Sequence, residues 1–130
     1  EVYTKSFDSK PLEGIMNGKI DLFFEHSGRY YILDWKSNYL GYQLENYNKD
    51  GLLQAMNENN YHLQYLIYTV AVKKFLESRM PDFDYEKHFG GVIYIFLRGT
   101  RTHNDSGIFT ARPSLDKITA LEKMLHAPVV

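Results

Sequence analysis

Two kinds of apolar pattern alternate along the chain, and the first is typical of β-strands. Residues 18–25 and 29–37 are rich in Ile, Leu, Phe, Tyr and Trp, residue types that favour strands. The stretch His26-Ser27-Gly28 lies between them and contains the glycine of a short turn. The two segments are therefore predicted to pair as an antiparallel hairpin.

Two further strands are predicted in the second half of the chain. Residues 92–97 follow Gly90-Gly91 and are apolar on both alternations, which indicates a strand buried on both faces. Residues 108–110 follow a polar turn at 102–107 and predict a short strand.

The second pattern is helical and is clearest from Tyr61 to Met80. Apolar residues recur there at spacings of three and four, which places them on one face of a helix. This stripe consists of Leu63, Leu66, Ile67, Val70 and Ala71. Asn59 or Asn60 is expected to cap the start of the helix, and Pro81 is expected to end it.

Residues 38–58 are polar and predict a loop with a short helix near residues 51–57. A last amphipathic helix is predicted after Pro113-Ser114, with its apolar face made by Leu115, Ile118, Leu121 and Leu125. The order is strand, strand, helix, strand, strand, helix, and no repeat or linker divides it. At 130 residues the chain is long enough for one core, so we expect a single α/β domain in which helices cover a sheet.

Composition narrows the chemistry of this domain. The chain has no cysteine, which excludes disulfides, thiolate zinc sites and iron–sulfur clusters and fits a cytoplasmic protein. It has neither a long uncharged apolar run nor a basic, apolar start, so neither a membrane span nor secretion is indicated. The net charge of -1 gives no global nucleic-acid signature, so any DNA binding must come from local groups, a bound cation or partner domains.

Three charges within the predicted hairpin need partners, because burying an unpaired charge costs free energy. Asp34 and Lys36 are two positions apart and point to the same face of their strand, and Asp21 lies on the neighbouring strand. With matching register the two carboxylates come close together and repel each other. Mg²⁺ is held by one or two carboxylates plus waters and substrate phosphate, so the set is sufficient in outline for phosphodiester cleavage.

The alternative is structural: Asp34 and Lys36 could form a surface ion pair at a sheet edge, worth only about 0–1 kcal/mol. The D-x-K triplet alone does not decide between the two, because Asp8-Ser9-Lys10 repeats it in a polar stretch without strand character. What distinguishes Asp34-Trp35-Lys36 is the apolar run that leads into it and the strand aspartate that precedes it.

A longer set of motifs resembles a known nuclease family. It includes the D-x-K strand and the helical Q-x-x-x-Y pair Gln64 and Tyr68, which lie on one side of their helix. The matching segments are residues 18–22, 31–38, 63–68, 82–94, 96–99 and 107–113. Together they resemble the RecB-type nucleases of the PD-(D/E)xK superfamily over nearly the whole chain.

The resemblance implies a restriction-endonuclease-like α/β core with a mixed β-sheet flanked by helices. It implies Mg²⁺, with Mn²⁺ as a substitute, bound by Asp21, Asp34 and the backbone carbonyl of Trp35. Lys36 would be the catalytic lysine, and Gln64 and Tyr68 would support it or contact DNA. From packing alone, Gln64 and Tyr68 are boundary residues of the helix.

The same resemblance implies an exonuclease that acts in double-strand-break repair and recombination. Its partners would be DNA, the helicase portion of the same polypeptide and the other subunits of a helicase–nuclease complex, with ATP used only by helicase domains outside this chain. Because the chain opens on Glu1, we expect a fragment that lacks the family's upstream helix with a further metal ligand, and therefore weak or no cutting by the fragment alone. His62 stands where relatives are expected to have an acid, and as a structural residue it would face solvent.

Two other functions remain open at this point. The chain could be a non-catalytic module that docks subunits of a DNA-repair complex, although the intact Asp21, Asp34 and Lys36 argue against a decayed site. It could also be another PD-(D/E)xK phosphodiesterase, which would need a DNA-reading surface of its own.

Overall fold

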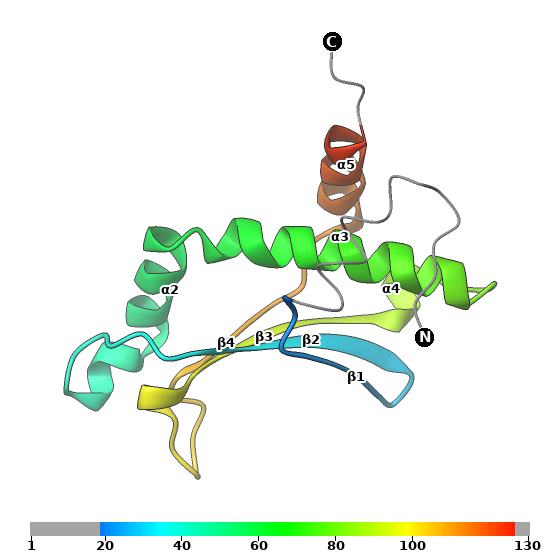
Figure 1. Ribbon diagram of the computed structural model, residues 1–130. Helices are drawn as coiled ribbons and strands as arrows, with labels where there is room; N and C mark the ends of the chain where they lie inside the picture. The colour runs from blue at the N-terminus through cyan, green and yellow to red at the C-terminus, as the bar shows by residue number, and fades with distance from the viewer. Residues whose placement is uncertain (1–18, 127–130) are drawn as a thin grey trace.

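In a computed structural model, residues 19–126 are described, and they form a four-stranded mixed β-sheet with helices packed on it (Figure 1). The strand order across the sheet follows the chain. The strands are β1 (Leu22–His26), β2 (Arg29–Lys36), β3 (Phe89–Phe96) and β4 (Ile108–Ala111). The α/β class and the mixed sheet flanked by helices are therefore confirmed.

The predicted hairpin forms between β1 and β2, which pair antiparallel. Its two-residue turn places Ser27 at φ 54° and Gly28 at φ 80°, the left-handed conformations that suit a tight hairpin turn. The first strand is shorter than predicted, because β1 begins at Leu22. Asp21 thus lies just before the strand rather than within it, and Gly18 lies outside the described residues.

Strands β2 and β3 run parallel, and α3 (Tyr61–Arg79) lies in the connection between them. Parallel neighbours require such a long crossover, which a helix usually supplies. The register pairs Asp34 with Tyr94 and Lys36 with Phe96. Gly90 is needed for the register at the start of β3, because a Cβ there would overlap the ring of Tyr31.

Most of the predicted helices are confirmed. The long helix and the last helix are close to their predicted bounds, whereas the segment predicted as residues 51–57 is longer and is preceded by a 3-10 turn. The remaining elements are η2 (Leu44–Tyr47), α2 (Lys49–Glu58), α4 (Tyr85–His88), η3 (Leu97–Gly99) and α5 (Leu115–Leu125). Asn60 is at the cap position of α3 as predicted, but it makes no side-chain capping hydrogen bond.

The predicted two-sided burial of residues 92–97 is wrong. From Val92 onward, β3 alternates between buried and half-buried positions, and Leu97 belongs to η3. Figure 1 shows the reason: within the described chain the helices lie on one face of the sheet. Val92, Tyr94 and Phe96 belong to the core on that face, so the alternating Ile93 and Ile95 are directed to the other face.

The predicted apolar stripe of α3 is partly wrong as well. Val70 and Ala71 are buried, but Leu63 is 52% exposed. The helix presents tyrosines to the sheet in its first turns, at Tyr61 and Tyr65, and these amphipathic rings take the places that aliphatic residues were expected to fill.

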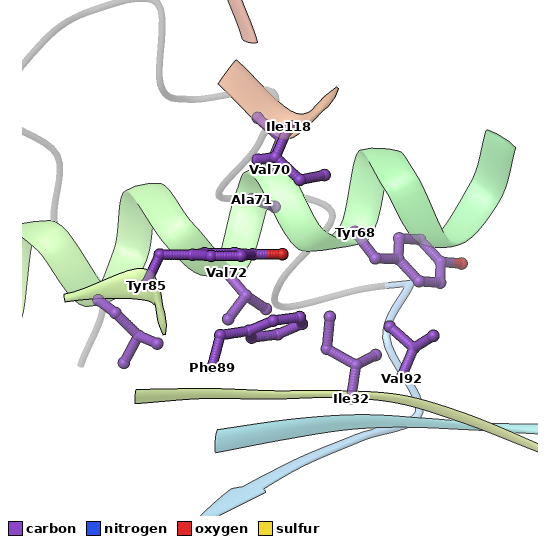
Figure 2. Close-up of a cluster of buried hydrophobic side chains, with 10 residues drawn as sticks. Ile32, Tyr68, Val70, Ala71, Val72, Tyr85, Phe89, Val92 and Ile118 are labelled. Carbon is purple, nitrogen blue, oxygen red and sulfur yellow. The ribbon is translucent and has the colours of Figure 1, made fainter. Parts of the chain in front are cut away.

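Two clusters of buried side chains make up the core. The first lies between α3, the sheet and α5 and includes Ile32, Tyr68, Val72, Phe89 and Ile118 (Figure 2). The second, formed by α2, η2 and the second half of β3, consists of Tyr47, Leu52, Ala55, Met56, Tyr94 and Phe96. Tyr65 packs against both clusters, so they meet beneath the first half of α3.

Candidate active site

Asp34 and Lys36 lie at the C-terminal end of β2. Because side chains alternate between the faces of a strand, both face the helices, on the same side as Ile32. Asp34 is only 3% exposed. The Nζ atom of Lys36 is 2.7 Å from Oδ2 of Asp34, an ion pair in which both side chains are largely removed from water. The alternative of a solvent-exposed surface pair is therefore excluded, and this carboxylate is a buried charge.

Asp21 lies beside this pair although it is not part of a strand. The pair farthest from the hairpin turn joins Leu22, the first residue of β1, to Leu33, so β2 continues for three residues without a partner in β1. There the Oδ2 atom of Asp21 accepts a hydrogen bond from the backbone N–H of Trp35, at 3.0 Å. The side chain of Asp21 thus takes over the place of a strand partner at this edge of β2.

The backbone carbonyl of Trp35 points toward the same edge. In a strand, the N–H and C=O of one residue are directed to the same neighbour, and the N–H of Trp35 is directed to Asp21. Asp21, Asp34 and this carbonyl therefore supply three groups with oxygen atoms that could bind a cation, near the first residue of β1.

The electrostatics of Asp34 reflect its burial. Desolvation raises the pKa of Asp34 above its ordinary value, the ion pair with Lys36 opposes this, and the nearby carboxylate of Asp21 raises the pKa further. The net shift is upward because the effect of burial outweighs the ion pair with Lys36.

Such a donor set fits a hard divalent cation. Mg²⁺ binds through one or two carboxylates and keeps several waters. Among residues 19–126 there is no group of three or more His, Asp or Glu side chains that could enclose a metal ion. The described residues therefore fit a partial, open magnesium site and not a closed cage.

Two tyrosines enclose the ammonium group of Lys36. Its Nζ atom lies 4.1 Å from the ring centroid of Tyr61 and 5.3 Å from that of Tyr94. Both rings are held by their hydroxyls: Tyr61 donates to the side chain of Asn38 at 3.1 Å, and Tyr94 donates to Oε1 of Gln64 at 2.6 Å. The lysine is thus fixed between one carboxylate and two aromatic faces, and Gln64 acts on it through Tyr94.

Tyr68, the second residue of the Q-x-x-x-Y pair, lies on the acidic side of the site. Its hydroxyl donates to the backbone carbonyl of Lys19 at 3.2 Å. Burial raises the pKa of Tyr68 to about 12, with further contributions from the charges of Asp34 and Asp21. Gln64 and Tyr68 therefore both lie near the D-x-K strand. Gln64 is linked to Lys36 through Tyr94, and Tyr68 is bonded to the segment that leads to Asp21.

The expectation that His62 faces solvent is wrong. His62 is half-buried, its Nδ1 atom is 3.0 Å from the hydroxyl of Tyr65, and its ring packs edge-on against Tyr65 and Phe109. It joins α3 to β4 and is not among the residues around Lys36.

Sequence reasoning missed Tyr61, Tyr94 and Asn38. Tyr94 could have been found from one signal: it carries a hydroxyl in an otherwise apolar strand. Tyr61 and Asn38 gave no such signal, because only the crossover of the chain brings them to Lys36. The comparison triplet Asp8-Ser9-Lys10 lies outside the described residues.

None of the described helices combines the length and the apolar character that crossing a membrane would require.

Relatives of known name match most of the chain, although no protein-family model does. The RecBCD enzyme subunit RecB of Haemophilus influenzae is 44% identical over 119 residues, which are 92% of this chain and 10% of that protein. The RecBCD enzyme subunit RecB of Escherichia coli is 46% identical over 114 residues, 87% of this chain and 10% of that protein. The subunit of the same name from Mycobacterium tuberculosis is 35% identical over 124 residues, 89% of this chain and 11% of that protein. The chain thus spans about a tenth of the length of these relatives, and it belongs to the RecB family.

Proposed function

We propose that this chain is the nuclease portion of a RecB-type subunit and hydrolyses DNA phosphodiester bonds with Mg²⁺. The observation that carries the proposal is the buried Asp34–Lys36 pair, 2.7 Å between Nζ and Oδ2, placed beside Asp21 at the open edge of β2. The similarity to RecBCD enzyme subunits supports a role in DNA repair and recombination. DNA, the helicase portion of the same polypeptide and the other subunits of a RecBCD-type complex are its proposed partners.

In this proposal Asp21, Asp34 and the Trp35 carbonyl hold the cation. Mg²⁺, when bound, polarises a phosphoryl oxygen and lowers the pKa of a water ligand. Asp21 and Asp34 carry two carboxylates and Lys36 one ammonium group, and this excess of negative charge favours binding of a cation. Mn²⁺ has similar preferences for oxygen ligands and should substitute for Mg²⁺.

Lys36 has a separate task. An ammonium group has three donors, of which the pair with Asp34 uses one. The others can donate to a water or to a phosphate oxygen and so neutralise charge that develops on the phosphate. Tyr61 and Tyr94 hold the ammonium in place without taking up a donor, because they present ring faces to it.

The direct test is Lys36→Ala in the complete RecB-type enzyme. Removing a donor that stabilises developing charge costs about 10²–10³ in kcat. We expect Mg²⁺-dependent DNA degradation to fall by at least about 100-fold, while ATP-driven unwinding is unchanged, since the chain is proposed to contribute only the nuclease. Gel assays of degradation and a strand-displacement assay measure the two activities on the same preparation.

Lys117→Ala is the matched control, because Lys117 is an exposed lysine in the first turn of α5. It should leave both activities at the level of the unaltered enzyme. Degradation that persists in the Lys36→Ala enzyme would contradict the proposal, and a defect confined to subunit assembly would favour the docking module instead.

A further inference from the structure

The parallel strands β2 and β3 end at the same edge of the sheet, and the segments that follow them lie side by side. The chain leaves β2 at Lys36 and leaves β3 at Phe96, and these two residues are neighbours in the ladder. In α/β sheets the crevice outside the carboxyl ends of parallel strands is the usual place for ligands. The segment after Lys36 and the turn η3 after Phe96 therefore border the candidate active site.

Two tyrosines in the first of these segments are directed to water. Tyr39 is 62% exposed and Tyr42 is 87% exposed. Both lie within six positions of Lys36 in the sequence. Aromatic rings of this size are usually at least half-buried, so two exposed rings on one short segment offer flat surfaces for a ligand.

Two arginines come from the other segment. The Nε atom of Arg98 donates to the backbone carbonyl of Ser37 at 2.7 Å, and its guanidinium lies 5.8 Å from the ring centroid of Tyr39. Arg98 is therefore attached to the residue that follows Lys36. Arg101 follows η3 and is exposed.

These side chains surround a common hollow of about 290 Å³. It is lined by Tyr39, Gly41, Tyr42, Gln43, Leu44, Tyr47, Arg98 and Arg101, which include two arginines and no carboxylate. Glu45, the next residue along the chain, lines the neighbouring hollows instead. The charge inside this hollow is thus positive.

The walls of the hollow are fixed by packing. The hydroxyl of Tyr47 accepts a hydrogen bond from the N–H of Leu40 at 3.0 Å, and its buried ring occupies the space that a Cβ at residue 99 would need. Gly41 has φ 134°, and a Cβ there would overlap the side chain of Asn46. The backbone that carries Tyr39 and Tyr42 is therefore held in place before a ligand binds, which limits the conformational entropy lost on binding.

From this geometry we propose that Tyr39, Tyr42, Arg98 and Arg101 form a subsite for single-stranded nucleic acid next to Lys36. Bases stack on the two tyrosines, and the arginines bind the phosphates between them. A single strand is required because the bases of a duplex are already stacked on one another and do not offer their faces. The inference rests on the proposed nuclease function, since it would guide a strand toward Asp34 and Lys36.

The test measures binding without cleavage. Fluorescence anisotropy of a labelled oligo(dT) is followed with the full 130-residue chain in EDTA, so the result does not depend on metal or on catalysis. Tyr42→Ala should weaken binding about fivefold or more, and Tyr42→Trp should restore it, because base stacking needs only an aromatic face. Arg101→Gln should weaken binding and lower the slope of log K against log salt by about one.

Matched controls lie at other places on the molecule. Met124→Ala removes a side chain that is 73% exposed on α5, and Lys87→Gln removes an exposed charge on α4, at the opposite end of β3. Both should bind oligo(dT) like the unaltered chain. The binding assay contains no metal and records no cleavage, so a failed cleavage proposal and a failed subsite are distinguished.

Three results would overturn the subsite: no binding of oligo(dT) by the unaltered chain, equal affinity for a duplex of the same length, or unchanged affinity in Tyr42→Ala and Arg101→Gln. In the complete enzyme, the supporting result is a raised KM for single-stranded DNA in Tyr42→Ala with kcat unchanged.

Discussion

At the scale of single residues, the site is organised around one ammonium group. Lys36 meets the carboxylate of Asp34 on one side and the rings of Tyr61 and Tyr94 on the other. A cation over an aromatic face is stabilised by about 0.5–2 kcal/mol, more when water is excluded. The rings therefore restrict where the ammonium can lie, and we regard them as positioning residues for the proposed reaction.

Two substitutions of Tyr61 distinguish the contribution of its ring from that of its hydroxyl. Tyr61→Phe keeps the face above Lys36 and loses only the hydrogen bond to Asn38, so kcat of the complete enzyme should change less than about threefold. Tyr61→Leu removes the face, and kcat should fall about 5- to 30-fold, which corresponds to about 1–2 kcal/mol, with little change in KM. Single-turnover cleavage of single-stranded DNA measures this step.

A purely structural role for Tyr61 would give a different result. In that case both variants would change the free energy of unfolding and neither would change kcat in the folded enzyme. Equal losses of kcat in Tyr61→Phe and Tyr61→Leu would assign the effect to the hydroxyl and contradict the role of the ring.

The sequence was a good guide to the charged residues of the site and a poor guide to their neighbours. That Asp34 and Lys36 lie together beside Asp21 could be predicted, because charges in an apolar stretch of sequence are costly to bury and therefore conspicuous. Their catalytic role stays a prediction. Tyr61 could not, since a tyrosine is an ordinary core residue and only the fold brings it to Lys36. Tyr94 is conspicuous in its apolar strand, but the strand does not show that its ring lies beside Lys36. His62 was misjudged for the same reason, because its partner Phe109 is far away in the sequence.

At the scale of elements, α3 and α5 are joined by a small charge network. Nζ of Lys73 is 2.9 Å from Glu77 on its own helix and 2.9 Å from Glu122 on α5. Burial lowers the pKa of Lys73, but the two carboxylates more than offset this, so the pKa lies above its ordinary value of 10.5. The protonated lysine therefore stabilises the packing of α5.

Lys73→Met keeps the aliphatic stem and removes the charge. We expect a loss of about 1–2 kcal/mol in the free energy of unfolding at pH 7, since the pair is largely buried but Glu122 keeps a second partner in Lys74. A group whose pKa is higher in the folded than in the unfolded state stabilises the fold at any pH below its unfolded pKa. This stabilisation is lost as the pH rises through the folded pKa. The difference between the two proteins should therefore be constant near neutrality and shrink above about pH 10.5.

Urea unfolding of the chain between pH 7 and pH 11 checks this prediction. Lys117→Met, which changes an exposed lysine on α5, serves as the control and should cost little at any pH. A difference that is as large at pH 11 as at pH 7 would indicate lost packing rather than lost charge.

Elements with a strong local signal were predicted well, and those held by distant contacts were not. The hairpin and α3 follow from turn chemistry and from a long periodic run. The 3-10 turn η2 contains Tyr47, whose buried ring packs against Gly99 of η3, a contact between residues far apart in the sequence. The one-sided burial of β3 likewise depends on where the helices lie, which the apolar run itself does not encode.

At the scale of the whole molecule, the site lies where the two core clusters meet. Tyr68 belongs to the cluster between α3 and α5, and Tyr94 belongs to the cluster around α2. The clusters therefore contribute differently to the site. Phe96 packs directly behind Tyr61, with 6.4 Å between ring centroids, whereas Ile118 lies beyond α3, against Val70 (Figure 2).

This arrangement predicts that stability and activity respond in opposite order to two core substitutions. Ile118→Ala leaves a cavity in the cluster away from the site and should cost about 2–5 kcal/mol in the free energy of unfolding. The complete enzyme should nevertheless keep its kcat within about twofold at a temperature where it stays folded, because the neighbours of Lys36 do not move. Phe96→Leu should cost less, about 1–3 kcal/mol, yet lower kcat by about 5- to 30-fold, since Tyr61 loses its support and with it the cation–π contact to Lys36.

Denaturant unfolding of the chain and single-turnover cleavage by the complete enzyme give the two rankings independently. If kcat followed the loss of stability in both variants, the core would act as one unit and the junction of the clusters would have no special part in positioning Lys36. If Phe96→Leu lowered kcat while Ile118→Ala did not, Phe96 would be assigned to the site, as a residue that supports Lys36 through Tyr61 and does not contact the proposed cation ligands.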